Sequence, residues 1–281
     1  MIPIEFIYCQ AETLQEAAQI HAQFLTDGLS SVYYGGGSEI ITMARAGGIS
    51  PGAVIDIKRI AECKVLESDN GDLIIGAANS LSRIKESKYF PLLGSACGRI
   101  ADHTNQCRIT LGGNICGTIR YRETSLPLML SEAELVLFGP GGKHIVPFRE
   151  AFDHRLKLED SEFVSQVRIP GWAPQAKWAH VKKTAREKID YPLVNVSALV
   201  KEGRLRAAFS GICPFPFRSE EIEHVLNDRS ASTQSRAEAI TGLLPENAWT
   251  NSEASGQYRL FVLKNTVYRL LADWENGDIL Q

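Results

Sequence analysis

In the first sixty residues, the spacing of apolar residues is typical of one helix and two strands. Thr13 and Glu16 have the spacing of a capping box, and the apolar residues that follow them lie on one helical face until Gly28. This pattern predicts a helix. Short β-rich runs at 30–34 and 53–57 predict two strands, and the first leads directly into three consecutive glycines, Gly35 to Gly37.

The middle of the chain alternates short strand patterns with turn residues. Asn70-Gly71 is a strong hairpin dipeptide between two β runs, and the apolar stretch 89–102 is typical of a buried helix. Runs at 133–139 and 143–148 predict strands joined by Pro140-Gly141-Gly142, which lacks the spacing of a phosphate loop and favours a hairpin turn. After a strand at 163–169, two prolines and a glycine within 169–175 indicate a domain boundary.

Beyond this boundary the pattern indicates a smaller domain of about a hundred residues. Runs at 176–183, 192–200 and 204–212 predict an antiparallel meander of three strands, and three helical stretches then close the chain at 219–228, 233–243 and 252–275. The fold class is therefore predicted to be α+β. We place a larger domain over 1–172, with lobes of about 1–57 and 58–172, and a C-terminal domain over 173–281.

Composition and charge exclude several classes of protein. The 281 residues are 44% hydrophobic and 22% charged, with a net charge of −3, so we expect no nucleic-acid partner. No apolar run approaches the roughly 20 residues of a membrane helix, and no basic segment precedes an apolar core at the N-terminus. We therefore expect no membrane contact and a cytoplasmic location. The six cysteines form no CxxC pair and the six histidines no spaced pair, which predicts free thiols and no metal site.

Two glycine loops are the candidate anion-binding segments. A tight glycine turn presents backbone N–H groups to an anion without any charged side chain. The first loop, Gly35 to Glu39, matches neither the Walker motif nor the dinucleotide fingerprint, so turn and phosphate loop are equally compatible with it. The second, Thr110 to Asn114, adds a hydroxyl, two glycine amides and a carboxamide. Two such loops facing each other could hold a dinucleotide pyrophosphate from both sides.

A set of ordered signatures then resembles one known family, the FAD-binding medium subunits of molybdenum hydroxylases. The opening phrase FIYCQAETLQEA, the loop GGGSEI, the strand AVIDIKRI and the hairpin GDLIIGAANSLSRI all resemble family phrases. So do the second loop TLGGNI, the C-terminal phrase GICPFPFRSEEIE and the final helix SEASGQYRLFVLKNTVYRLL. The resemblance runs from about residue 4 to 272 in the correct order. It implies a two-lobed FAD-binding domain of the PCMH type, followed by a small α+β domain with a three-stranded sheet and a helix bundle.

The resemblance also implies the cofactor and the residues that hold it. FAD is expected as the only prosthetic group, with no metal and no catalytic side chain. Glu123 takes the place of a ribityl-side aspartate, Val164 that of an apolar residue against the isoalloxazine, and Lys182 that of a cation near the ring, with Lys183 as an alternative. The full expected set is Tyr34, Gly35, Gly36, Gly37, Ser38, Glu39, Ile40, Ile100, Ala101, Thr110, Leu111, Gly112, Gly113, Asn114, Glu123, Val164 and Lys182.

Two stretches depart from the family pattern. Gln106-Cys107 replaces the usual Arg-Asn before the second loop, and residues 116–122 replace a stretch of small residues and proline. Arg120 and Arg122 in that stretch could approach phosphates or cover a subunit interface, and we favour the interface. Glu123 is one methylene longer than the usual aspartate.

The function implied by the resemblance is electron transfer within a multi-subunit oxidoreductase. A small subunit with 2Fe–2S clusters and a large molybdopterin subunit are the implied partners, in a dimer of heterotrimers, with NAD or another molecule as acceptor. A purine, xanthine-type dehydrogenase is favoured by resemblance alone. Two alternatives stay open: a stand-alone FAD-dependent oxidase, and a non-catalytic interaction module that has lost FAD.

Overall fold

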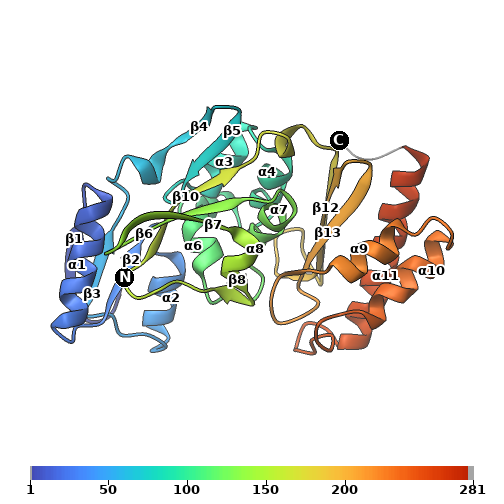
Figure 1. Cartoon of the computed structure of the whole chain (residues 1–281). Coiled ribbons are helices and arrows are strands. Elements are labelled where there is room, and N and C mark those ends of the chain that lie inside the picture. The colour runs from blue at the N-terminus through green and yellow to red at the C-terminus, as the bar shows by residue number, and fades with distance from the viewer. Residues whose placement is uncertain (1, 278–281) are drawn as a thin grey trace. The chain divides into compact units, whose positions relative to one another are not determined.

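The computed structural model describes residues 2–277, which pack as two compact units (Figure 1). Unit 1 contains the chain up to Tyr89 together with residues 103–117 and 132–171. Unit 2 contains residues 90–102 and 118–131 and the chain from Trp172 onward. Both units mix helices and strands, so the predicted α+β class is confirmed.

Unit 1 begins with a small parallel sheet. Its strand order is β1 (Ile7–Gln10), β3 (Ala53–Asp56), β2 (Ser31–Tyr34), with α1 (Leu14–Thr26) and α2 (Ser38–Arg45) as the connections. The predicted first helix is confirmed, and the Thr13 hydroxyl accepts the Glu16 N–H at 3.1 Å as a capping box requires. Tyr34 pairs with Asp56. The residues that follow β2 and those that follow β3 therefore lie side by side at the carboxyl edge of this sheet.

The second sheet of unit 1 has five strands that pair antiparallel in the order β4-β5-β10-β6-β7. The predicted hairpin is confirmed: Asn70 and Gly71 both have positive φ, 51° and 92°, as its turn requires. The bounds in this unit are β4 (Leu66–Asp69), β5 (Asp72–Gly76), β6 (Glu134–Gly139), β7 (Gly142–Pro147), β8 (Phe152–Asp153), β9 (Arg155–Leu156), β10 (Phe163–Ile169), η1 (Glu62–Lys64), α3 (Leu81–Ser87), α5 (His103–Gln106), α6 (Leu111–Cys116) and α8 (Phe148–Ala151).

Unit 2 is built on an antiparallel sheet in the order β11-β12-β13-β14. The predicted three-stranded meander is present as its first three strands. A fourth strand of two residues extends it, because Phe217 and Arg218 pair with Phe209 and Ala208. The bounds are β11 (Trp178–Thr184), β12 (Pro192–Lys201), β13 (Arg204–Ser210), β14 (Phe217–Arg218), α4 (Pro91–Cys97), α7 (Ser125–Leu130), η2 (Ala173–Gln175), α9 (Glu220–Asn227), α10 (Thr233–Ala239), η3 (Ile240–Gly242) and α11 (Gly256–Asn276).

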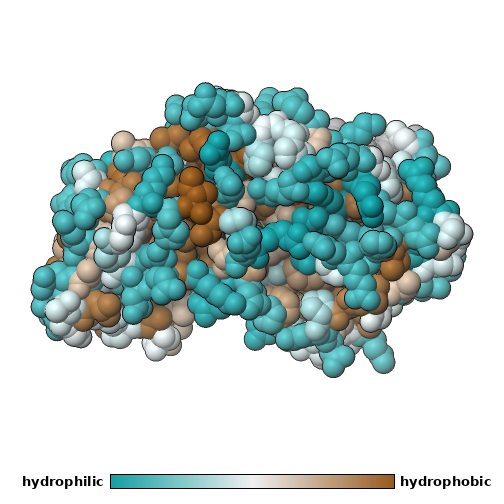
Figure 2. Space-filling view, viewed as in Figure 1, coloured by the Kyte–Doolittle hydropathy of each residue, from teal (hydrophilic) through white to brown (hydrophobic). Residues whose placement is uncertain are grey.

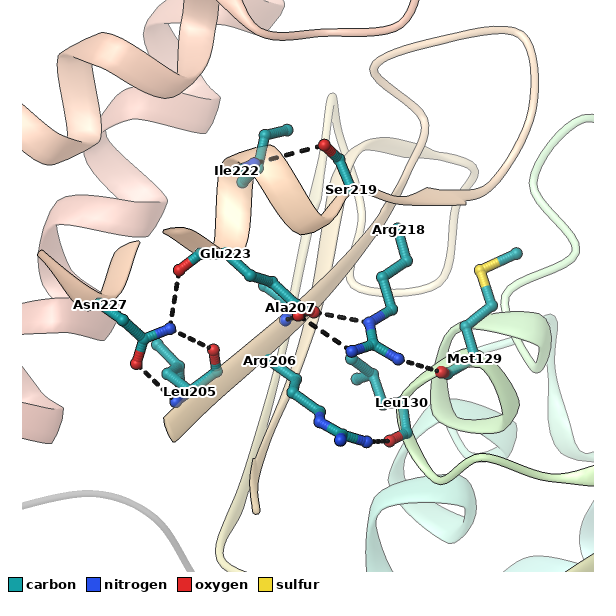
Figure 3. Close-up of polar contacts among 10 residues, drawn as sticks. All are labelled: Met129, Leu130, Leu205, Arg206, Ala207, Arg218, Ser219, Ile222, Glu223 and Asn227. Carbon is teal, nitrogen blue, oxygen red and sulfur yellow. Dashed lines mark hydrogen bonds and ion pairs between the residues drawn. The ribbon is translucent and has the colours of Figure 1, made fainter. Parts of the chain in front are cut away.

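Arg218 connects β14 to α9 and α7. Its guanidinium pairs with the Glu223 carboxylate through contacts of 2.6 and 2.9 Å, and its third nitrogen donates to the Met129 carbonyl at 2.9 Å (Figure 3). Arg206 donates to the neighbouring Leu130 carbonyl. Cations suit the C-terminal carbonyls of a helix, so these two arginines hold the end of α7 against β13 and β14.

This packing places two early segments with the C-terminal elements. Helix α7 packs on β12, β13 and β14, and α4 packs on β11 and α7. Helix α4 is shorter than the predicted 89–102: it begins at Pro91 and ends at Cys97. Residues 90–102 and 118–131 precede the predicted boundary near residue 172, yet they belong to unit 2. The two compact units therefore do not divide the chain at this single point. As a division of function, the boundary stays a proposal.

The surface seen in Figure 2 is mostly hydrophilic, and its largest apolar patch lies over unit 1 near β10. The apolar residues of unit 2 form a closed core that includes Val196, Phe209, Leu263 and Val267, all at most 1% exposed. Within residues 2–277, no helix combines the length and the apolar character needed to cross a membrane.

Candidate functional site

The first glycine loop connects β2 to α2 in unit 1. Gly37 is the N-cap of α2 and has φ of 70°, a left-handed conformation that favours glycine. Within the part of the chain that the structure describes, no side chain caps this helix. The N–H groups in the first turn of an α-helix have no partner within the helix, the N-cap Gly37 offers no side chain to accept from them, and the helix dipole makes this end attractive to an anion.

The two glycine loops touch each other, and glycine is what permits the contact. A Cβ built on Gly36 would lie 1.7 Å from the Arg108 carbonyl oxygen, and one on Gly35 would lie 2.7 Å from Thr110 Oγ1. A real side chain at Gly36 would thus overlap backbone. The expectation that these loops come together is met within unit 1.

The second loop forms differently from our expectation of free glycine amides. Thr110 caps α6, and its Oγ1 accepts the Gly113 N–H at 3.1 Å. Leu111 and Gly112 donate their N–H groups to the carbonyls of Asn79 and Ala77 at 3.0 and 2.9 Å. These three N–H groups already donate to acceptors within the protein, so they do not point to an anion here. Of the two loops, the first is therefore the candidate for amide donors to an anion.

The remaining expected residues fall on both units. Val164 lies on β10 of unit 1, buried at 3% exposure, where the pairing with β6 shifts register. Glu123, Lys182, Ile100 and Ala101 belong to unit 2, the last with a positive φ of 52°.

Glu123 and Lys182 form a buried ion pair inside unit 2. Lys182 Nζ donates to Glu123 Oε1 at 2.8 Å and to the Arg99 carbonyl at 2.7 Å, while Asn195 Nδ2 donates to Glu123 Oε2 at 2.8 Å. The two ionic side chains are 1% and 5% exposed. Burial raises the pKa of the Glu123 carboxyl to about 6, although the Lys182 ammonium opposes that rise. The charge of Lys182 is thus balanced by a carboxylate at contact distance.

Lys183, the alternative to Lys182, has an exposed side chain. The two lysines alternate along β11 and so point to opposite faces of the strand. Only Lys182 enters the polar network around Glu123.

The departures from the family pattern have defined places. Arg120 lies over the Trp249 ring at 4.3 Å, and Arg122 is buried and donates to the Ile119 carbonyl at 2.9 Å. Gln106 is buried, and Cys107 is exposed with its sulfur 3.8 Å from His103 Nε2. Arg120 and Arg122 therefore contact residues of unit 2 in this chain.

Comparison with protein families decides the assignment of this chain. The model of the FAD binding domain in molybdopterin dehydrogenase matches residues 4–172. The chain belongs to this family. FAD is therefore its cofactor, and its chemistry is that of an oxidoreductase.

Individual relatives of this molybdopterin dehydrogenase FAD domain agree with the family assignment. The carbon monoxide dehydrogenase medium chain of Hydrogenophaga pseudoflava is 28% identical over 231 residues, with 78% of this chain and 79% of that one covered. The glyceraldehyde dehydrogenase medium chain of Sulfolobus acidocaldarius is 27% identical, with 79% and 81% covered, and caffeine dehydrogenase subunit beta of Pseudomonas is 25% identical, with 82% and 80% covered.

Solved structures match the fold over nearly the whole chain. Carbon monoxide dehydrogenase from Hydrogenophaga pseudoflava superimposes with a TM-score of 0.84 at 24% identity, covering 98% of this chain and 99% of that one. Quinoline 2-oxidoreductase from Pseudomonas putida 86 superimposes with a TM-score of 0.83 at 22% identity, covering 99% of both chains. The similarity in fold to these structures therefore includes the C-terminal elements beyond residue 172.

Gly113 tests whether the loops fit FAD. Outside its own helix and chain neighbours, a Cβ on Gly113 would approach only Thr110 Oγ1, at 3.0 Å, among the residues that the structure describes. Glycine costs a helix about 1 kcal/mol relative to alanine, and the Thr110 hydroxyl is the end of a side chain rather than backbone, so packing restricts this position less than it restricts Gly36. Glycine is also expected where a ligand approaches the backbone closely. A glycine at this position, beside the glycine-led start of α2, fits a flavin dinucleotide.

His180 on β11 gives unit 2 a pH-dependent stability. Its Nδ1 lies 2.9 Å from Ser197 Oγ, and burial, reinforced by Arg99 and Lys182, lowers its pKa from 6.5 to about 3. The unfolded chain takes up this proton below about pH 6.5 and the folded chain does not, so stability falls by about 1.4 kcal/mol per pH unit as the pH drops through this window.

We expect His180→Gln to remove this dependence. Relative to the variant, the wild-type chain should lose about 2 kcal/mol of unfolding free energy between pH 6.5 and pH 5, measured by urea denaturation. Glu123 contributes with the opposite sign between about pH 6 and 4.5, and since it is present in both chains it cancels in the difference. Parallel pH profiles for the two chains would show that His180 is not held neutral.

Proposed function

We propose that this chain is the FAD-carrying medium subunit of a three-component molybdenum hydroxylase. It receives electrons from a small subunit with 2Fe–2S clusters and delivers them to NAD or another acceptor, while a large molybdopterin subunit oxidises the substrate. Bound FAD would supply the exchange between single-electron and two-electron transfer. The named medium chains among its relatives support this assignment. A dimer of heterotrimers and a cytoplasmic location belong to the same proposal, and the six free thiols are consistent with the latter.

The observation that carries the proposal is the glycine-led start of α2, whose N-cap Gly37 has no side chain, together with the close approach of Gly35 and Gly36 to the second loop. In this assignment, the N–H groups of Gly36 and of the first turn of α2 bind the pyrophosphate. The Thr110 hydroxyl already accepts from Gly113, so its own proton remains for donation to the cofactor. These residues bind and orient the cofactor, and no side chain is required for proton transfer.

The substrate belongs to the large subunit in this proposal. One relative is a caffeine dehydrogenase, and caffeine is a purine, which supports a purine as substrate. Relatives named for carbon monoxide and glyceraldehyde are comparably similar. Co-purification of the tagged chain from its native cells tests the assembly. Recovery of subunits that carry molybdopterin and iron–sulfur clusters is expected, and a yellow chain recovered alone with intrinsic oxidase activity would contradict the proposal.

Gly113→Ala tests the cofactor site separately from the assembly. We expect the variant to melt close to the wild-type temperature, because the helix preference of alanine offsets the 3.0 Å approach of its methyl to Thr110 Oγ1, yet to bind FAD at least about tenfold more weakly because the methyl occupies ligand space. Titration of the apoprotein with FAD, followed by flavin fluorescence, measures this. Gly141→Ala is the matched control, since Gly141 lies in the open β6–β7 turn with no described atom within 4 Å of its built Cβ. Wild-type affinity in Gly113→Ala would refute the site.

A further inference from the structure

Lys58 lies against the first glycine loop, although the loop itself contains no basic residue. It follows β3 by two residues, and the parallel pairing of β2 with β3 places it beside Gly35. Its Nζ donates to the Gly35 carbonyl at 3.1 Å and to Asp56 Oδ2 at 2.5 Å. The same ammonium lies 4.5 Å over the Tyr34 ring centroid.

Asp56 anchors this lysine. Its side chain is 3% exposed, and it also accepts the Tyr8 hydroxyl at 2.7 Å and the Lys58 backbone N–H at 2.9 Å. The hydrogen bond to Asp56 raises the pKa of Tyr8 to about 12, so the phenol stays a donor at neutral pH. A carboxylate at the end of β3 therefore accepts a hydrogen bond from a phenol on β1 and holds the ammonium at a fixed position.

The bond from Lys58 to Gly35 sets the direction of the next amide. A peptide unit is planar and trans, so the Gly35 carbonyl and the Gly36 N–H point in opposite directions. With the carbonyl held by Lys58, the Gly36 N–H points away from it. In residues 2–277, this N–H makes no backbone hydrogen bond. Three consecutive glycines have wide conformational freedom, so an external anchor of this kind determines where their amides point.

We propose that Lys58 is the positioning residue of the first glycine loop, holding the Gly35 carbonyl so that the amides of Gly36 and the start of α2 are preset for the diphosphate of FAD. This inference rests on the proposed role of the loop. Lys58 acts through the loop backbone rather than on the isoalloxazine. It also leaves a positive charge, on a side chain 44% exposed, beside a loop that otherwise binds an anion by amides alone.

Neighbouring Arg59 supplies a matched control. Its side chain is 61% exposed and pairs at 2.9 Å with Glu12, itself 58% exposed, on the N-terminal side of α1. Lys58→Gln and Arg59→Gln therefore remove one positive charge each from adjacent positions, and only the first removes a bond to the loop. Lys58→Arg keeps both the charge and a donor.

The test is the dissociation constant for FAD of the full chain, measured by flavin fluorescence, with the melting temperature recorded for every variant. We expect Lys58→Gln to weaken FAD binding by about tenfold or more, Arg59→Gln to change it by less than about twofold, and Lys58→Arg to restore most of the loss. The same loss is expected for ADP, which carries a diphosphate without the flavin ring. The double variant Asp56→Asn, Lys58→Gln avoids an unpaired buried carboxylate and should show the same weakening.

The outcomes separate the two levels of the proposal. Equal weakening by Lys58→Gln and Arg59→Gln would reduce the effect to net charge and overturn the positioning role, as would wild-type affinity in Lys58→Gln. A loss in Lys58→Gln that Lys58→Arg does not recover would also overturn it. Failure of the wild-type chain to bind ADP and FAD would overturn the loop assignment itself, and this inference with it.

Discussion

Gly36→Ala is expected to eliminate FAD retention. A single methyl at this position would lie 1.7 Å from the Arg108 carbonyl oxygen and 2.7 Å from its carbon, and both atoms are backbone. Neither can rotate away, so the first loop must move off the second. Overpacking of this kind commonly costs about 1–3 kcal/mol of stability. It would also displace the amides of the first loop, and the purified variant should therefore lack flavin absorbance near 450 nm.

Gly35→Ala is the matched control because it adds the same methyl one residue earlier. There the nearest atom is Thr110 Oγ1 at 2.7 Å, the end of a side chain that can rotate. We expect this variant to retain flavin with a modest loss of affinity. Full flavin content in Gly36→Ala would mean that the two loops are not in contact as the structure has them.

Local signals in the sequence predicted most of the secondary structure. Thr13 with Glu16 predicted the start of α1, and Asn70-Gly71 predicted the β4–β5 turn, because in each case the residues that decide the geometry are adjacent in sequence. Strand β14 was not predicted. Its two residues pair with β13 through tertiary contact, and two residues carry no periodicity.

The sequence predicted which residues form the site better than it predicted their hydrogen-bond and ion-pair partners. Resemblance placed both loops, yet it could not show that Ala77 and Asn79 take the amides of the second one. That depends on which segment packs against the loop. Likewise, Glu123 and Lys182 are 59 residues apart, and only the fold reveals that they bind each other. Lys58 did have a sequence signal, since a cation just after the carboxyl end of a parallel strand lies at the edge where ligands bind in such sheets.

Lys182→Met is expected to destabilise unit 2 by about 3–5 kcal/mol at pH 7.5, because it leaves the Glu123 carboxylate buried without its counter-ion. Among the described hydrogen bonds to that carboxylate, the one from Asn195 Nδ2 would remain. Urea denaturation of the full chain measures the change. Lys183→Met is the matched control: the same substitution at the adjacent, exposed lysine should cost less than about 0.5 kcal/mol.

The protonation of Glu123 allows the pH dependence to show whether Lys182→Met loses stability through the lost charge or through lost packing. The carboxyl already has a pKa of about 6 with Lys182 present, and loss of the ammonium that lowers it must raise it further. A carboxyl whose folded pKa lies above its unfolded value favours the folded state as the pH falls, so Lys182→Met should recover stability relative to wild type between pH 7.5 and pH 5. The double variant Glu123→Leu, Lys182→Met, which buries no charge, should be close to wild type at both values. An equal deficit of Lys182→Met at both pH values would assign its effect to lost packing of the lysine stem, and the Glu123–Lys182 pair would then carry no electrostatic role in holding residues 118–131 to the sheet.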